Sequence, residues 1–262
     1  INIATHFETM DDMKMDNTWH QDDEFWQTMA TMMFSEDRWE SALEEVNALI
    51  TLLDLTRKAK ILDMGCGPGR HALELARHGF SVTGVDRTIL YLNQAKQKVE
   101  QEGLEVEFVQ ADMRSFRRES SFDVALSLFT TFGYFEDPEE NIKVLENLFR
   151  SLKEGGKLLM EMMGKEIMAR IFRQRDWREY NGIIHLEERM VTSDWSRMKN
   201  RWIKIEEGMR HEFKVTHWIY SAAELREMLK GVGFQVVNIF GGLEGSPYDH
   251  KARRLVAVAM KE

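Results

Sequence analysis

Three closely spaced glycines form the part of the sequence best suited to holding a ligand. Gly65, Gly67 and Gly69 separate an apolar run at residues 60–64 from a helical pattern that begins near residue 70. Glycine has no Cβ and tolerates positive φ, so such a turn lets the backbone approach a ligand closely. The start of the following helix also offers unpaired N–H groups to an anion. By itself this pattern predicts a nucleotide-like ligand without saying which one.

Two acids placed after the next apolar runs narrow the choice of ligand. Asp86 lies about 20 residues beyond Gly65, where a carboxylate can accept both hydroxyls of a ribose. Asp112, followed by Met113, ends the third apolar run. The glycines read G-x-G-x-G, so the third comes earlier than in the G-x-G-x-x-G fingerprint of dinucleotide-binding proteins. Asp112 also has a plainer interpretation, as the N-cap of a helix.

Together the glycine turn and the two acids resemble the class I S-adenosylmethionine-dependent methyltransferases. The resemblance covers residues 59–162 strongly and residues 220–261 moderately. In that family the turn wraps the methionine end of the cofactor, the acid after strand two grips the ribose, and the acid after strand three meets the adenine amine. The resemblance therefore implies S-adenosylmethionine as cofactor, with S-adenosylhomocysteine as its product. The expected cofactor-binding residues are Asp63, Gly65, Gly67, Gly69, Asp86, Arg87, Asp112, Met113 and Leu128.

Two other functions stay open at this point. Arg87, beside the ribose acid, also suits a 2′-phosphate, which keeps a nicotinamide-dependent oxidoreductase as one alternative. The sequence has no obvious catalytic base, which keeps a catalytically silent cofactor-binding or interaction protein as another. Methyl transfer to a neutral amine needs little help from a base, so this absence decides little. Arg70 is expected to brace the turn or to cap a carboxylate.

The fourth strand carries the clue to the methyl acceptor. Methyltransferases that act on DNA bases or protein glutamine amides resemble one another in a [D/N]-P-P-[Y/F] motif here, where this chain has Ser127-Leu128-Phe129-Thr130. The departure favours an N or O atom of a small molecule as the acceptor. The side chains expected to line the acceptor site are Trp19, Trp26, Phe129, Phe132, Tyr248 and Arg254. His217, Tyr134 and Tyr220 are the candidates for catalysis, with His217 as a general base.

Each acceptor-side residue also has a structural interpretation. The aromatics after strand four equally suit a packed core, and a histidine such as His217 on an apolar strand face is more often structural. Arg254 equally suits a solvated edge strand. A basic cluster is interpreted as the solvated face of a helix; its members are Arg170, Arg173, Arg175 and Arg178.

Composition limits the class of protein and its partners. The chain has 262 residues, 43% hydrophobic and 30% charged, which is typical of a soluble globular protein. The net charge of −9 disfavours a nucleic-acid partner, and no apolar run is long enough to span a membrane. Cys66 is the single cysteine, so no intrachain disulfide can form and a cytoplasmic location is expected. The histidines are scattered without ligand spacing, so no metal is expected.

Alternating strand and helix patterns predict the architecture that positions these residues. From residue 59 to 162 the alternation predicts an α/β fold, a doubly wound and mostly parallel seven-stranded sheet, completed by a helix and a strand pair after residue 221. Residues 165–220 are predicted to form an inserted antiparallel β cap of about three strands. Residues 1–58 are predicted to form a helical lid, with one helix running from Trp39 to Leu53. The first residue is isoleucine, so the native start is expected to have been removed, and a monomer or homodimer is expected.

Overall fold

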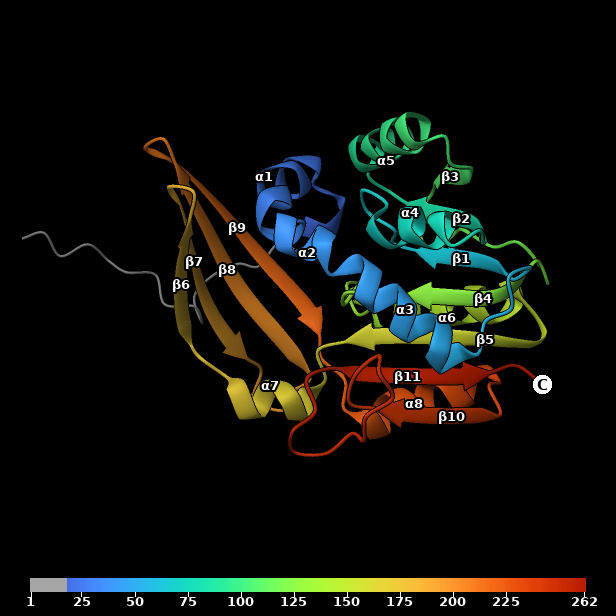
Figure 1. Ribbon diagram of the computed structural model, residues 1–262. Coiled ribbons are helices and arrows are strands. Elements are labelled where there is room, and N and C mark those ends of the chain that lie inside the picture. The colour runs from blue at the N-terminus through green and yellow to red at the C-terminus, as the bar shows by residue number, and fades with distance from the viewer. Residues whose placement is uncertain (1–17) are drawn as a thin grey trace, which may run out of the picture.

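The computed structural model of the chain describes residues 18–262. The acidic residues Asp11, Asp12 and Asp16 and the first part of the expected lid lie outside the described residues. Two separate β-sheets make up the framework, with helices packed on and between them (Figure 1).

The larger sheet has seven strands in the order β10-β11-β5-β4-β1-β2-β3. All neighbours pair in parallel except β11, which runs antiparallel to both β5 and β10. The chain thus starts the sheet at β1, winds outward to β3, and returns beside β1 with β4. The strands are β1 (Lys60–Met64), β2 (Ser81–Asp86), β3 (Val106–Gln110), β4 (Phe122–Ser127), β5 (Leu152–Met162), β10 (Val236–Phe240) and β11 (Leu255–Met260). The prediction of a doubly wound, mostly parallel sheet is confirmed.

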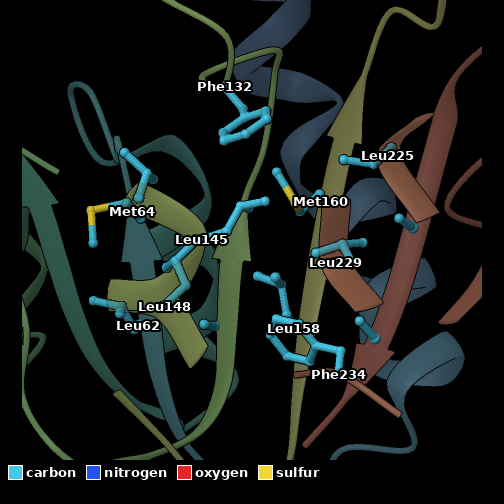
Figure 2. Close-up of a cluster of buried hydrophobic side chains, with 14 of the residues drawn as sticks. Leu62, Met64, Phe132, Leu145, Leu148, Leu158, Met160, Leu225, Leu229 and Phe234 are labelled. Carbon is cyan, nitrogen blue, oxygen red and sulfur yellow. The ribbon is translucent and has the colours of Figure 1, made fainter. Parts of the chain in front are cut away.

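Helices cover both faces of this sheet, because the parallel strands are apolar on both sides. On one face α6 (Pro138–Ser151) and α8 (Ala222–Val232) bury Leu145, Leu148, Leu225 and Leu229 against the strands (Figure 2). Ser221 caps α8 through a capping box with Glu224, as its sequence predicts.

The other face of the sheet packs against a second set of helices. There α3 (Ala42–Leu53) and α4 (Arg70–Arg77) contribute Val46, Leu49 and Leu75 to a separate core, and α5 (Ile89–Glu102) packs on β3 and α4.

The smaller sheet is an antiparallel meander of four strands, inserted between β5 and α8. Its strands are β6 (Arg175–Tyr180), β7 (Ile183–Val191), β8 (Arg197–Glu206) and β9 (Met209–Trp218), and α7 (Lys165–Ile171) leads into them. The sequence prediction missed β6, because its residues are exposed throughout and show no alternation of polar and apolar side chains. The helix-face interpretation of the basic cluster is therefore wrong for Arg175 and Arg178, which lie on β6, and for Arg173, which lies between α7 and β6.

Short helices at the start of the described chain lie between the two sheets (Figure 1). They are η1 (Trp19–Gln21), α1 (Asp23–Met33) and α2 (Glu36–Glu40). The single helix expected from Trp39 to Leu53 is divided, since α2 ends at Glu40 and α3 begins at Ala42. Among residues 18–262, no helix has the length and apolar character needed to cross a membrane.

Candidate functional site

A cavity of about 390 Å³ opens at the carboxyl ends of β1, β2 and β4. The chain reverses direction across the sheet between β1 and β4, and ligands of open α/β sheets bind at such a switch point. Its lining comes from the glycine turn, from the N-terminal helices and from one face of the β6–β9 sheet.

The glycine turn brings backbone to the cavity surface. Gly65 and Gly67 have φ of +75° and +55°, in the left-handed region that favours glycine. A Cβ on Gly65 would stand 2.9 Å from a Thr131 carbon, and one on Gly67 3.0 Å from the Phe34 ring. Gly69 does not line the cavity: it begins α4, and a Cβ there would meet Leu73 at 2.7 Å. Gly69 therefore serves helix packing rather than the cavity.

Asp63, the fourth residue of β1, is a buried acid without a partner. It is 2% exposed, and its Oδ2 has no hydrogen-bond donor among residues 18–262. Burial raises the pKa of Asp63 to about 6, with the neighbouring carboxylate of Asp86 adding to the effect and His71 and Arg70 opposing it. An ionised carboxylate in this position calls for a cationic group from a ligand.

Asp86 closes the turn from the end of β2. Its Oδ2 accepts a hydrogen bond from Gly67 N at 2.8 Å and its Oδ1 accepts one from Thr88 N at 2.8 Å. Burial raises its pKa, while these two backbone bonds favour the charged form. The remaining lone pairs of this carboxylate face the cavity and suit hydroxyl donors.

Arg87 and Arg70 are both engaged with protein groups. Arg87 pairs with Asp23 at 2.9 Å and also donates to Gln21 O, so it ties the loop after β2 to the N-terminal helices. Arg70 donates to Glu45 at 2.6 Å and to Arg38 O at 2.7 Å, as expected for a residue that caps a carboxylate.

Asp112 and Met113 line the cavity beyond β3. Asp112 accepts hydrogen bonds from Arg114 N at 2.8 Å and from the Arg114 guanidinium at 2.7 Å and 3.0 Å. Burial works against ionisation, but these bonds outweigh it and hold the pKa of Asp112 below its usual value. The carboxylate is thus charged and fixed in orientation at the cavity edge.

Aromatic side chains from the N-terminal helices cover the cavity. Trp19 and Trp26 line it together with Tyr134, whose ring centroid lies 4.8 Å from that of Trp19. Trp19 Nε1 donates to Thr216 O of β9 at 2.8 Å, and the Tyr91 hydroxyl of α5 donates to Trp26 O. These bonds fasten the N-terminal helices to the smaller sheet and to α5.

The loop after β4 projects Phe129 into the cavity, next to Leu128. Phe129 and Thr130 have φ of +59° and +58°, a strained conformation for residues with a Cβ. Glu161 holds the loop in place, since its Oε2 accepts from Phe129 N at 2.7 Å and its carbonyl accepts from Thr130 N at 3.1 Å. The guanidinium of Arg38 lies over the Phe129 ring, 4.3 Å from its centroid.

The β6–β9 sheet presents one face to the cavity by strict alternation. Residues on this face are Glu187, Arg189, Met198, Asn200, Trp202, Val215 and His217. Val215 and His217 lie two residues apart on β9 and so share this face. Burial, helped by nearby Arg197, lowers the pKa of His217 to about 4, so its imidazole is neutral at physiological pH.

Three residues expected at the acceptor or in catalysis lie outside the cavity lining. Phe132 is 2% exposed and belongs to the core under α6 and α8 (Figure 2). Tyr220 packs on Phe132 with ring centroids 5.4 Å apart, and its hydroxyl has no partner among the described residues. Tyr248 donates instead to Glu166 Oε2 at 2.9 Å. Core packing and this bond at α7 account for their positions.

Several cavity residues had no signal in the sequence. Arg38, Arg178, Arg189, Asn200 and Trp202 line the cavity, although none belongs to a motif. Alternation along β8 and β9 could have placed Asn200 and Trp202 on the face shared by His217, but only once the strand pairing was known.

Cys66 sits inside the glycine turn and faces the cavity. It is 8% exposed, and its thiol lies 3.7 Å from Gly67 O. Burial, together with the nearby carboxylates of Asp63 and Asp86, raises the pKa of this thiol well above its ordinary value.

Comparison with known proteins decides the family. Residues 61–156, which contain the turn and both acids, match the family model described as a methyltransferase domain. The putative methyltransferase YqeM of Bacillus subtilis (strain 168) is 28% identical over 213 residues, which cover 79% of this chain and 86% of that protein. The chain therefore contains a methyltransferase domain at residues 61–156.

Solved structures share the fold of this methyltransferase. A S-adenosylmethionine-dependent methyltransferase from Clostridium acetobutylicum ATCC 824 superposes with a TM-score of 0.76 at 14% identity, covering 91% of this chain and 98% of that one. CalS10, an amino pentose methyltransferase from Micromonospora echinaspora with S-adenosylmethionine bound, gives 0.63 at 21% identity, covering 90% and 96%. At such identities the likeness concerns the fold alone.

The turn of the methyltransferase fits S-adenosylmethionine in charge and shape. The unpartnered Asp63 carboxylate suits the ammonium of the cofactor, and Asp86 suits the two ribose hydroxyls. A Cβ on Gly65 or Gly67 would crowd the side chain of Thr131 or Phe34, so glycine suits both positions of the turn. No group of three potential metal-binding side chains occurs among residues 18–262.

Proposed function

We propose that this methyltransferase transfers a methyl group from S-adenosylmethionine to an N or O atom of a small-molecule acceptor. The observation that carries the proposal is the single cavity, which joins the acidic glycine turn to a wall of aromatic side chains and a neutral histidine. Its volume of about 390 Å³ lies within the range of small-molecule sites.

The residues at the turn would hold the cofactor. Asp63 would pair with its ammonium, Asp86 would accept from its ribose, and Asp112 with Met113 would border its adenine. When bound, the cofactor supplies a methyl group already activated on a positively charged sulfur. The protein therefore has to align the acceptor with that methyl group and exclude water.

The wall opposite the turn would receive the acceptor. Trp19, Trp26 and Phe129 offer flat apolar surface, and Tyr134 and His217 offer polar atoms beside it. Burial raises the pKa of Tyr134, so its hydroxyl stays protonated and can donate a hydrogen bond to the acceptor.

An amine nitrogen fits this wall better than a hydroxyl oxygen. A base with a pKa of about 4, as His217 has, is too weak to deprotonate an alcohol or a phenol. An amine that arrives neutral already presents its lone pair and needs only a later acceptor for its proton. The amino pentose named for the CalS10 enzyme is an acceptor of this type.

Two segments would enclose the reactants. We infer that residues 1–58 act as a lid and residues 165–220 as a cap over the methyltransferase domain formed by residues 59–164 and 221–262. Bonds such as Trp19 Nε1 to Thr216 O support this division, because they join lid to cap above the cavity.

Calorimetric titration of S-adenosylhomocysteine tests the cofactor side. The wild-type protein should bind it with a micromolar Kd, and Asp86→Ala should weaken binding at least about tenfold, because a ribose hydroxyl pair and the Gly67 N–H lose their acceptor. Glu107→Ala is a suitable control, since Glu107 lies on β3, pairs with Arg118 and lies outside the cavity lining. Absence of binding by the wild-type protein would refute the proposal.

A screen with methyl-labelled S-adenosylmethionine tests the acceptor side. Amines, phenols and carboxylates are offered separately, and label should appear on amines first. Label on phenols alone would contradict the preference for nitrogen. No transfer to any class, with cofactor binding intact, would favour a catalytically silent binding protein.

A further inference from the structure

Four arginines line one part of the cavity, where Arg178 and Arg254 act electrostatically on Arg38 and Arg178 acts on Arg189. They are Arg38 of α2, Arg178 of β6, Arg189 of β7, and Arg254, which directly precedes β11; we call them the basic end. The cavity is thus lined both by three aspartates near the ends of β1, β2 and β3 and by these four guanidinium groups.

The positive charge of the basic end is only half neutralised by protein. Glu187 lies between Arg178 and Arg189 and pairs with both, and Glu161 pairs with Arg254 at 2.8 Å. No carboxylate among residues 18–262 lies within ion-pairing distance of Arg38, whose Nη1 donates to Met33 O at 2.8 Å. Two carboxylates thus serve four guanidinium groups.

Burial makes the unmatched charge costly. The pKa of Arg38 is lowered to about 10, first by burial and then by Arg178, Arg254 and Arg70, against a smaller opposing effect of Glu45. The pKa of Arg189 is also lowered, mainly by burial, with Asp176 opposing the shift and Arg178 adding to it. Such repulsion is relieved when an anion enters.

Neutral donors on the cap face point to the same chemistry. Asn200 is 2% exposed, and its Nδ2 has no acceptor among the described residues; Trp202 Nε1 likewise lacks one. Both side chains line the cavity, and Asn200 pairs in register with Arg189 on the neighbouring strand. Guanidinium, amide and indole N–H groups all seek acceptor oxygens.

We propose that the methyl acceptor carries an oxyanion, a carboxylate or a phosphate, that binds at the basic end while its nucleophilic atom faces the cofactor turn. This inference rests on the proposed function. Guanidinium forks match both oxyanions in a bidentate manner, and the aromatic wall between the two ends suits the body of the acceptor. Acceptors that lack the anion leave buried donors and charge unpaired.

Small aromatic probes test the inference on the complex of the protein with S-adenosylhomocysteine. Benzoate, phenyl phosphate and benzamide are titrated separately and followed by calorimetry. At least one of the two anions should bind about tenfold or more tightly than benzamide, the range expected for a charge-assisted hydrogen bond, and their ranking tells carboxylate from phosphate. Equal affinity for all three probes would overturn the inference.

Matched variants locate the binding. Arg178→Gln and, separately, Arg189→Gln should weaken the favoured anion about 10- to 100-fold and leave S-adenosylhomocysteine affinity unchanged. Arg175→Gln is the control, because Arg175 lies on the same strand as Arg178, has a side chain that is 77% exposed and lies outside the cavity lining. Retained S-adenosylhomocysteine affinity shows that a variant is folded.

The outcomes separate this inference from the proposed function. If both variants weaken S-adenosylhomocysteine instead of the anion, the basic end serves the carboxylate of the cofactor and the inference is wrong. If the wild-type protein binds S-adenosylhomocysteine but does not prefer either anion, the inference alone fails. If it does not bind S-adenosylhomocysteine at all, both fail.

Discussion

Replacing Asp63 by asparagine should make the cofactor-free protein more stable while removing most of its affinity for the cofactor. The pKa of Asp63 is about 6, against an ordinary value of 3.8, mainly because the carboxyl group is buried. A difference of about 2 units corresponds to about 3 kcal/mol spent on keeping the carboxylate ionised at pH 8. In the variant, the buried and poorly hydrogen-bonded amide of asparagine itself lowers the free energy of unfolding by about 1–2 kcal/mol. The variant should therefore be more stable than the wild-type protein by about 1–2 kcal/mol.

The pH dependence of this gain identifies its origin. Because the pKa of Asp63 is raised in the folded state, its ionisation does not lower the free energy of unfolding below pH 3.8. As the pH rises from there, the free energy of unfolding falls, and the full loss is reached above about pH 6. At pH 4.5 the wild-type cost has fallen to about 1 kcal/mol, so the advantage of Asp63→Asn should disappear there. Urea unfolding at pH 8 and pH 4.5 measures both values.

The same variant should bind S-adenosylhomocysteine about tenfold or more weakly at pH 8, because the ammonium of the ligand loses its ionic partner. Asp123→Asn is the matched control, because Asp123 lies near the start of β4, away from the strand end at the cavity, and pairs with Lys153 at 2.6 Å. It should lose a little stability and keep its ligand affinity. An equal gain for Asp63→Asn at both pH values, or an unchanged ligand affinity, would refute the reasoning.

Two further substitutions test the turn and the cap. Gly65→Ala should lower S-adenosylhomocysteine affinity and destabilise the fold by about 1–3 kcal/mol, since φ is +75° and the new Cβ would stand 2.9 Å from Thr131. Calorimetry measures the affinity and urea unfolding measures the stability. Unchanged affinity and stability would count against the tight turn. His217→Gln should lower kcat and leave S-adenosylhomocysteine affinity intact. The wild-type rate should not change between pH 5 and 7 through titration of His217, because the lowered pKa keeps this histidine neutral until the pH falls towards about 4. A fall in rate centred near pH 6.5 that is absent in the variant would contradict this.

Local sequence was enough to predict the part of the site that depends on neighbouring residues. The glycine turn, Asp86 and Asp112 each follow directly from a strand of the parallel sheet, and parallel strands end at one edge. Once the strands were assigned, these groups had to meet there. The mostly parallel, seven-stranded sheet followed in the same way from alternating strand and helix patterns and from the resemblance to a known family, whereas the order of its strands came only from the structure.

The acceptor side depends on contacts between distant parts of the chain, which local patterns do not contain. Arg38 and Arg189 are about 150 residues apart in the sequence and line the same cavity only because α2 and the inserted sheet both fold over the strand ends. Arg178 shows the same limit: its basic neighbours suggested a helix, while strand pairing with β7 put it at the cavity. Phe132, expected at the acceptor site, and Tyr220, expected in catalysis, lie outside the cavity lining because both pack in an apolar core.

Cys66 places the strongest potential nucleophile of the chain inside the turn that receives the methyl donor. Burial and the two nearby aspartates keep its sulfur protonated, and its S–H points to the carbonyl of Gly67. The same acids that suit a cationic cofactor thus suppress the thiolate that would compete for its methyl group. Protection against self-methylation is therefore owed first to the burial of the thiol, and the charge that selects the cofactor adds to it.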